Sequence, residues 1–330
     1  MKTLIVYLGL AAAGYAAAIP FRKKKEYFGW IGPVLAWVVR ILVFLMGLRI
    51  GSNEEVVENL AAIGVQSLLI AVVSLAFTVA AVHAARRAAG FNRFGRRCTE
   101  AGQKEEKQPA HKKADAGEKT PILSRSNLFM LASVAAGFAC GYLAVLKLQL
   151  TDYETLYGLS GLFVSTGLYV MVFLVGMDMG FDSNTFRALQ GSGLFMLVIP
   201  VVTAVATLAA VLLCSLFMPL TLQEAAAVAC SYCWYSLAPN IIMEAGFAVA
   251  GAYSFLTNFL RVLLSLITIP LVAARVGYLE TVGMPCGASM DVCIGTIQIS
   301  TSRETALYAF VSGVFFMVII PVLVPLIVGL

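Results

Sequence analysis

Charged residues and histidine are both scarce in this 330-residue sequence. Asp, Glu, Lys and Arg together make up 12% of the residues, well below the ~25% that is typical of soluble domains. Apolar residues make up 60%, and the mean hydropathy is +0.88. This composition excludes a water-soluble globular domain and indicates that lipid surrounds most of the chain.

Sequence motifs of catalysis are also missing. The only histidine in an apolar run is His83, near the end of that run, and no catalytic triad, phosphate-binding loop or nucleotide site is present. ATP hydrolysis by this chain is therefore excluded. Cys230 and Cys233 have CxxC spacing, but they lie in an apolar stretch without a second pair or a nearby histidine. We expect no cofactor and no metal, and an enzyme that uses these thiols is the least favoured alternative.

Long apolar runs predict α-helices, because unpaired backbone polar groups are costly in hydrocarbon and the alternation of a lipid-facing barrel strand is absent. Two apolar stretches, 221–246 and 282–302, are interrupted by proline and glycine. The prediction is an all-α polytopic membrane protein with eight transmembrane helices plus these two broken segments. The eight predicted spans are 3–19, 30–50, 60–84, 126–148, 156–180, 189–216, 248–273 and 305–329.

Basic residues predict the orientation of the chain in the membrane. Residues 22–25 carry four positive charges directly after the first run, which favours a retained helix with its N-terminus outside over a cleaved signal peptide. Residues 85–125 contain eleven Lys and Arg among small and polar residues, as expected for a solvated cytoplasmic linker. Lipid-phosphate or nucleic-acid binding by this linker is the weaker alternative, and we expect no nucleic-acid partner.

Two internal repeats organise the rest of the chain. Residues 43–51 match residues 172–180 at an offset of 129 residues. Because each copy holds three helices, an odd number of crossings inverts the second copy, as in many secondary transporters. A weaker match, at an offset of 55, relates residues 252–270 to residues 307–325. The predicted units are 1–84, the linker 85–125, the inverted copy 126–217, and two units of broken segment plus helix in 218–330. Chance similarity among membrane helices is the alternative.

The two broken segments allow two topologies. As re-entrant hairpins they would return to their own side, which places Arg275 in the cytoplasm and both termini outside. As full crossings they would place Arg275 outside. We favour hairpins, which also make the two C-terminal units an inverted pair.

Irregular backbone at membrane depth must line protein or a water-filled cavity, so the broken segments are predicted to form the transport site. Their polar stretches, 231–244 and 287–298, each contain one carboxylate, Glu244 or Asp291, which suits a cationic substrate. Either could instead carry the coupling proton, since a desolvated carboxylate holds a proton more tightly. Otherwise, Glu244 is a loop residue at the membrane edge and Asp291 a helix cap. The candidate substrate-binding residues are Trp234, Tyr235, Ser236, Asn240, Glu244, Asn258, Arg261, Ser289 and Asp291.

Several other charges fall within or near the spans. Arg49 and Asp178 occupy matching repeat positions near helix ends, where snorkelling to the interface explains both. Arg261 lies about halfway along its span, with Thr257 and Asn258 one turn away. It could neutralise a carboxylate or bind the carboxylate of the substrate. For Trp234 and Tyr235, simple packing is the alternative to a binding role.

The motif Trp234-Tyr235-Ser236-Leu237 with Glu244 downstream, the motif Ser289-Met290-Asp291 and the paired Phe-Leu-x-Gly repeats resemble the lysine exporter (LysO) family. The resemblance covers nearly the whole chain outside 85–125. It implies export of L-lysine and its toxic analogues from the bacterial cytoplasm across the inner membrane, with Trp234, Tyr235, Ser236, Glu244 and Asp291 as site residues.

The chain departs from the family pattern in one helix. An Asn-Asp pair precedes the helical arginine in the family, whereas Thr257 and Asn258 precede Arg261 here, and Val262 replaces a glutamate. Two acidic groups are therefore missing. A substrate with less positive charge, or a different coupling ion, would fit these losses.

We therefore expect a secondary transporter that exports lysine or a related cationic amino acid in exchange for protons. Inward proton flow can drive export of a cation against an inside-negative potential of about 2.3 kcal/mol per charge per 100 mV. The alternative is a sodium- or proton-coupled carrier of an organic anion, in which Glu244 and Asp291 would bind the coupling cation. A homo-oligomer is compatible with the sequence.

Overall fold

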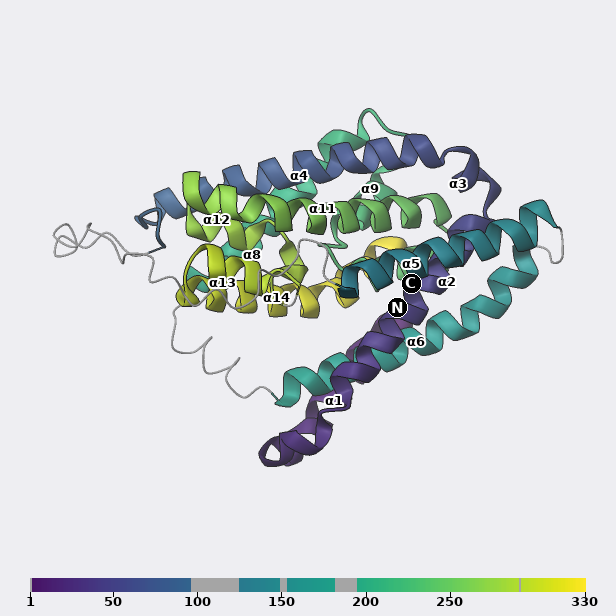
Figure 1. The fold of residues 1–330 in the computed structure, drawn as a ribbon, viewed down its shortest axis with the longest axis horizontal. Helices are drawn as coiled ribbons and strands as arrows, with labels where there is room; N and C mark the ends of the chain where they lie inside the picture. Colours follow the sequence, from purple (N-terminus) through teal and green to yellow (C-terminus); the bar gives the residue numbers. More distant parts are fainter. Residues whose placement is uncertain (1, 96–124, 149–152, 182–194, 291) are drawn as a thin grey trace.

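A computed structural model of the chain describes residues 2–95, 125–148, 153–181, 195–290 and 292–330. All regular structure in these ranges is helical, which confirms the all-α part of the prediction (Figure 1). The long helices are α1 Lys2–Ala18, α2 Ile31–Ser52, α4 Leu60–Ala88, α5 Arg125–Gly141, α6 Tyr153–Phe181, α8 Phe195–Ser215, α11 Ala248–Arg275 and α14 Arg303–Val328. The short elements are η1 Ile19–Phe28, α3 Glu54–Glu58, η3 Tyr142–Lys147, α9 Leu222–Ala229, α10 Ala238–Glu244, α12 Tyr278–Gly283, η4 Cys286–Ser289 and α13 Ile294–Ser300.

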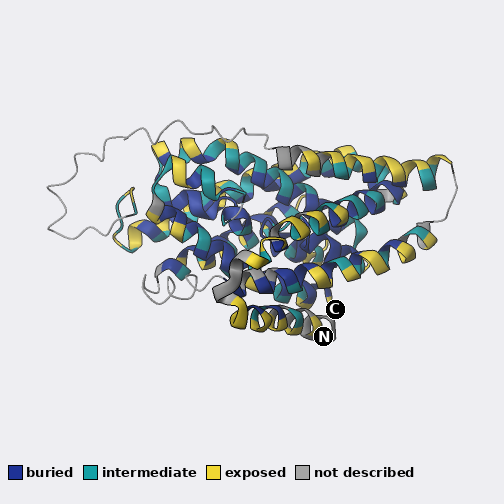
Figure 2. Cartoon of the chain, turned by 60° about the horizontal axis from the view of Figure 1, so that its bottom comes forward, coloured by how far each residue is buried: buried dark blue, intermediate teal, exposed yellow. Residues whose placement is uncertain are grey.

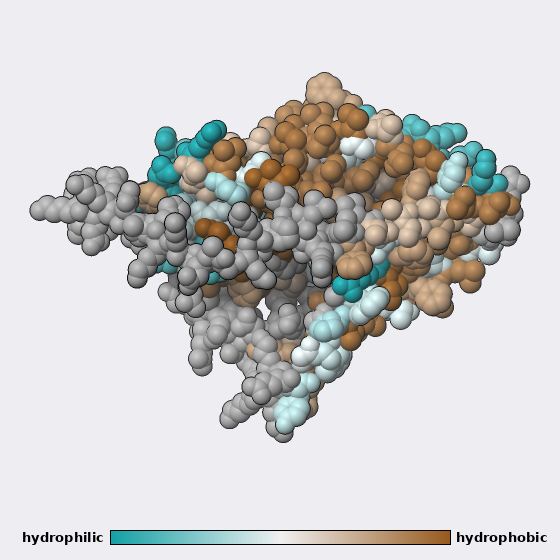
Figure 3. All heavy atoms as spheres, in the orientation of Figure 1, coloured by the Kyte–Doolittle hydropathy of each residue, from teal (hydrophilic) through white to brown (hydrophobic). Residues whose placement is uncertain are grey.

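Each of the eight predicted spans coincides with one long helix, although residues 189–194 of the sixth lie outside the described ranges. Within those ranges, five helices are long and apolar enough to cross a membrane, and the other three contain shorter apolar stretches. Hydrophobic side chains cover the middle of the visible face, and hydrophilic ones gather at its upper left and upper right (Figure 3). The chain is therefore a multi-pass membrane protein.

Glycines allow the helices of the two matched halves to touch. A Cβ atom on Gly47 or Gly51 of α2, or on Gly137 or Gly141 of α5, would lie 2.1–2.4 Å from a carbonyl oxygen of the partner helix. Gly14 of α1 meets the backbone of α6 in the same way. Because lipid provides no hydrophobic drive between helices, such small residues permit the close packing that holds them together. Gly47, the glycine of the first Phe-Leu-x-Gly copy, is therefore a packing residue.

A third pairing joins α4 to α8. Thr78 Oγ1 and Thr207 Oγ1 lie 3.4 Å apart, and the two residues are separated by 129 positions. This separation equals the offset of the first repeat. The three pairings, α2 with α5, α6 with α1 and α4 with α8, each join one helix from residues 1–84 with one from residues 126–217.

The broken segments unwind where non-glycine residues adopt left-handed backbone angles. In the first segment, residues 230–237 separate α9 from α10, and the φ angles of Tyr232 and Cys233 are 37° and 67°. In the second segment, Cys286 has a φ of 45° between α12 and α13. These conformations are costly for L-residues and end the helices. The second segment begins at Tyr278, four residues before the predicted start, because Glu280 and Thr281 lower the local hydropathy.

The two ends of the bundle can be defined by their contacts. The α3 end is where α2 ends and where α4 and α11 begin, since α3 contacts the start of both. The linker end is where α4 and α11 end, and there Arg93 donates to the carbonyl oxygen of Ala274 at 2.7 Å. Figure 1 shows the linker end at the left and the two termini close together. Most buried residues lie between the two ends of the bundle (Figure 2).

Each broken segment returns to the end of the bundle from which it starts. Gln223 of α9 donates to Ile327 near the end of α14 at 2.8 Å, and α10 leads directly into the start of α11 at the α3 end. Glu280 of α12 contacts the last turns of α4, and α13 leads into the start of α14 at the linker end. We name residues 222–244 the first hairpin and residues 278–300 the second hairpin. Their unwound tips touch, because the N–H of Gly287 donates to the oxygen of Tyr232 at 3.0 Å.

The close packing of α2 on α5 predicts an asymmetric response to two identical substitutions. Gly137→Ala places a methyl group 2.1 Å from the Phe44 oxygen, whereas a Cβ on Gly64 of α4 meets nothing within 4 Å. We expect Gly137→Ala to lower the free energy of unfolding by about 1–3 kcal/mol. Gly64→Ala should leave it unchanged or raise it by about 0.5–1 kcal/mol. Melting temperatures in detergent measure both, and equal melting temperatures would contradict the packing described here.

Candidate substrate site at the crossing of the two hairpins

Two polar side chains of α11 hold the hairpin tips. Asn258 Oδ1 accepts a hydrogen bond from the N–H of Cys233 in the first tip at 2.8 Å. Arg261 Nε donates to the carbonyl oxygen of Met284 in the second tip at 2.9 Å. Both side chains are buried, one turn apart near the middle of α11. They satisfy backbone groups that unwinding leaves without helical partners, which at membrane depth would otherwise cost several kcal/mol each, roughly.

Arg261 also joins three helices to one another. Its Nη1 donates to Thr207 of α8 at 3.0 Å, and its Nη2 donates to Thr78 of α4 at 2.8 Å. No carboxylate among the described side chains lies within 4.0 Å of it. Through these three hydrogen bonds, the guanidinium fixes the second hairpin against α4, α8 and α11. The rigid, forked shape of guanidinium suits three acceptors in fixed positions.

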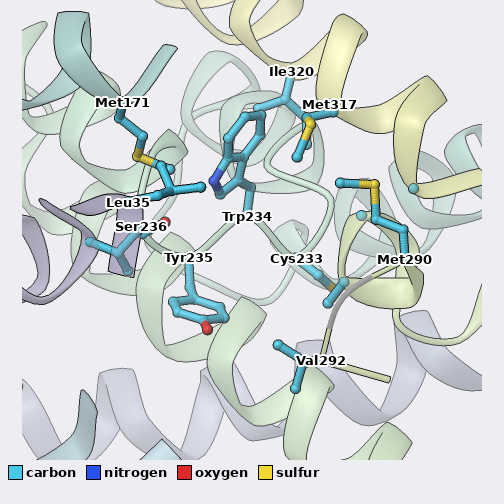
Figure 4. Close-up of a pocket in the computed structure, with 14 residues that line it drawn as sticks. Leu35, Met171, Cys233, Trp234, Tyr235, Ser236, Met290, Val292, Met317 and Ile320 are labelled. Carbon is cyan, nitrogen blue, oxygen red and sulfur yellow. The ribbon is translucent and has the colours of Figure 1, made fainter. Parts of the chain in front are cut away.

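A cavity of about 150 Å³ lies beside the crossing. The predicted residues Trp234, Tyr235 and Ser236 line it, and the Trp234 ring points toward Met317 and Ile320 while Tyr235 turns the other way (Figure 4). Pockets for drug-sized ligands span about 300–1,000 Å³, so this one suits a smaller solute. The lining residues are Leu35, Val39, Met171, Cys233, Trp234, Tyr235, Ser236, Gly287, Ala288, Met290, Val292, Gly313, Met317 and Ile320.

Glu244 forms an ion pair at the α3 end instead of lining the cavity. Its Oε1 lies 2.7 Å from Arg49 Nη1, and Arg49 Nε donates to Ser160 at 2.9 Å. The Arg49 side chain is 1% exposed and that of Glu244 is 25% exposed. Snorkelling was therefore the wrong expectation for Arg49, which is buried against a counter-charge. In the sequence, Arg49 stood out because the matching repeat position holds the oppositely charged Asp178. Nothing in the sequence identified Glu244 as the partner of Arg49.

The other predicted site residues are held within the protein or lie outside the described ranges. Ser289 donates to the oxygen of Ala309 at 2.7 Å, and Asn240 Nδ2 donates to the oxygen of Ser236 at 3.0 Å. Neither residue lines the cavity. Asp291 lies outside the described residues, although Met290 and Val292 on either side of it line the cavity.

A multi-pass helical protein in which two broken segments meet beside a small buried cavity has the architecture of a membrane transporter. The model of the lysine exporter LysO family matches residues 131–328. The chain is also 24% identical over 322 residues to the lysine exporter LysO of Escherichia coli (strain K12), covering 97% of each chain. No solved structure matches it.

The chain belongs to the lysine exporter LysO family. This confirms the resemblance that the Trp-Tyr-Ser-Leu and Ser-Met-Asp motifs indicated. The chain is therefore a transporter and not an enzyme.

The ion pair between Arg49 and Glu244 predicts a compensating double substitution. Arg49→Met leaves Glu244 without its counter-charge, and breaking a buried pair from one side costs about 3–5 kcal/mol. We expect a clear drop in melting temperature for Arg49→Met and for Glu244→Gln, and a partial recovery in the double variant. Additive losses in this cycle would show that the two side chains are not coupled.

The fork of Arg261 predicts that a lysine cannot replace it. Arg261→Lys keeps the charge but cannot reach the three acceptors together, and each lost hydrogen bond to a charged group costs about 1.5–3 kcal/mol. The matched control is Arg275→Lys, at an exposed position of the same helix. We expect a lower melting temperature for Arg261→Lys only. Equal melting temperatures for Arg261→Lys and Arg275→Lys would contradict the structural role of the Arg261 guanidinium.

Proposed function

We propose that this chain exports L-lysine or a closely related cationic amino acid from the cytoplasm in exchange for protons. The observation that carries the proposal is the small, largely apolar cavity at the crossing of the hairpins, lined by Trp234, Tyr235 and Ser236. The aliphatic stem of lysine matches such a lining, and an aromatic ring face also attracts a cation. Membership of the family and the name of the full-length relative support lysine as the substrate.

In this proposal, eight helices span the bacterial inner membrane and the two hairpins are re-entrant. The linker end faces the cytoplasm, because Arg86, Arg87, Arg93 and Arg275 gather there and positive charge is retained inside. Both termini then lie outside. The acidic α3, with Glu54 and Glu58, lies at the opposite end of the bundle.

Two contacts support an inverted-repeat architecture. In a pair of repeats related by a two-fold axis, a residue on the axis meets its own counterpart. Thr78 meets Thr207, 129 positions later, and Tyr232 meets Gly287, 55 positions later. These are the two offsets of the sequence repeats, which supports the units 1–84 and 126–217 and the two units within 218–330. Exchange of conformations between such repeats is a common route to alternating access.

The carboxylates are assigned separate tasks in the proposal. Asp291, in the second hairpin between two residues that line the cavity, receives the ammonium group or the coupling proton. Glu244, paired with Arg49, acts at the α3 end of the transport pathway. Inward movement of protons supplies the free energy for cation export, which opposes a membrane potential of about 2.3 kcal/mol per charge per 100 mV.

One observation favours a second candidate, a cation-coupled carrier of an organic anion. Arg261 is a buried permanent cation with no carboxylate within 4.0 Å among the described side chains. An anionic substrate would be attracted to this part of the protein. The two candidates differ in which charge of the ligand is essential.

A fluorescence experiment separates these candidates. The chain contains three tryptophans, and Trp30 and Trp37 are both exposed on or beside α2. In the variant Trp30→Phe/Trp37→Phe, Trp234 reports on the cavity alone. We expect L-lysine to change its emission and norleucine, which lacks the side-chain ammonium, to have no effect. A response to organic anions without a response to lysine would favour the second candidate.

Transport in proteoliposomes then tests the coupling. We expect labelled lysine to leave loaded vesicles faster when a pH step drives protons inward. Asp291→Asn and Glu244→Gln should reduce this efflux by at least about tenfold, which corresponds to about 1.4 kcal/mol. Efflux that does not depend on the pH step in folded protein would contradict proton exchange.

A further inference from the structure

A buried ionic cluster lies at the linker end, away from the cavity. It consists of Glu280 of α12 together with His83 and Arg86 of α4, and Glu280 lies more than 190 positions from the other two in sequence. Glu280 Oε1 lies 2.8 Å from His83 Nδ1 and 2.8 Å from Arg86 Nε. The side chain of Glu280 is fully buried and that of Arg86 is 5% exposed, whereas that of His83 is 31% exposed. His83 is therefore the member of the cluster in contact with the surroundings.

The geometry requires a proton between His83 and Glu280. A neutral imidazole nitrogen without hydrogen and a carboxylate oxygen are both acceptors, so a separation of 2.8 Å places one proton between Nδ1 and Oε1. Arg86 Nη2 lies 3.1 Å from the same Nδ1, and its Nη1 donates to the oxygen of Phe91 at 3.0 Å. The second oxygen of Glu280, Oε2, is buried and accepts no hydrogen bond from the described residues. The carboxyl group therefore has an unused site for a second proton.

No further ion pair to the cluster is formed among the described residues. Helix α12 packs against α4, α8, α11, α14 and η4, and the titratable side chain of η4 is Cys286. Helix α8 carries no charged residue in its described range, and the charges of α11 are Arg261 in its middle and Arg275 in its exposed last turn. The titratable side chains described on α14 are Glu304 and Tyr308, and no contact within ion-pair or hydrogen-bond distance joins either to Glu280.

The fold itself does not require these charges. The positions 129 residues after His83 and Arg86 are Leu212 and Ser215, and the position 55 residues before Glu280 is Ala225. The repeat-related positions at the α3 end are thus occupied by apolar or small residues, whereas those at the linker end form an ionic cluster. Burying charge is expensive and adds little net stability compared with apolar packing. Because the repeat-related positions carry no charge, this cluster indicates a task beyond packing.

We propose that His83 and Glu280 form a proton-binding site that exchanges protons with the solvent at the linker end and controls how firmly the second hairpin is held to α4. This inference rests on the proposed function, since the proton bound there would be the coupling proton on its way to or from the cytoplasm. The proposed site lies outside the cavity, and its ligand is a proton.

The proton transfer balances without a further reactant. A solvent proton binds to Nε2 of His83, and the proton at Nδ1 passes to Glu280, so that the ring is again neutral and the carboxyl is protonated. Neutral Glu280 no longer attracts the guanidinium of Arg86 by charge. The contact that fixes α12 to α4 weakens as a result, and the reverse transfer restores it.

A spectroscopic experiment tests proton binding without reference to transport. The chain contains two histidines, and His111→Gln leaves His83 as the sole histidine of the full-length protein. With isotope-labelled histidine in detergent micelles, we expect the His83 signal to change with pH as the site gains or loses its proton. Glu280→Gln should alter this pH response. An identical response in Glu280→Gln would overturn the coupling between the two groups.

The pH profile of transport tests the consequence. Lysine counterflow, measured at equal pH on both sides, should vary with pH in the wild type and in the matched control His111→Gln. His83→Gln keeps a hydrogen-bonding side chain but cannot relay a proton, and we expect its profile to vary less than about twofold over one pH unit, where a single titrating group gives up to about tenfold. An unchanged profile would overturn the proposal. Absence of lysine counterflow in the wild type would overturn the proposed function instead, and the spectroscopic result would still decide the proton site.

Discussion

The three hydrogen bonds donated by Arg261 join parts of the chain that would otherwise have no reason to stay together. One goes to the unwound tip of the second hairpin and the others to threonines on α4 and α8. A helix that breaks inside a bilayer exposes polar backbone groups, and there is no water in the hydrocarbon to satisfy them. Arg261 and its neighbour Asn258 supply these partners from the middle of one continuous helix. The cavity exists because both tips are fixed there.

Glycine contacts and polar contacts stabilise different parts of the structure. Where α2 meets α5 and α1 meets α6, backbones touch directly, and a Cβ atom at the contacting glycines would clash. Near the crossing, by contrast, side chains such as those of Asn258 and Arg261 span the gaps between elements. The first kind of contact produces rigid helix pairs, and the second fixes irregular backbone that helix packing cannot satisfy. The cavity lies between these regions, lined by α2 and α6 on one side and by the hairpins and α14 on the other.

Much of the helix pattern could be predicted from the sequence, because each long apolar run determines one helix by its own length. The broken segments were also detectable, since Pro239, Pro285 and Gly287 interrupt otherwise apolar stretches. The motif at Trp234 lines a cavity. Partners could not be predicted in the same way. Glu244 finds Arg49 195 positions away, and Glu280 lies 197 positions from His83. Such pairs depend on how the helices pack, which no local pattern records. Glu280 itself escaped notice because it ends an apolar run and reads as a helix-end charge.

The meeting of Thr78 with Thr207 has a consequence for how this protein can change over evolutionary time. The two hydroxyl groups lie 3.4 Å apart and both accept a hydrogen bond from the same guanidinium. Volume added at one position has to be removed at the other, and a hydroxyl lost at either leaves a buried N–H of Arg261 without its acceptor. Substitutions at the two codons are therefore not independent, and relatives of this chain should preserve the pair as a unit or exchange both members together.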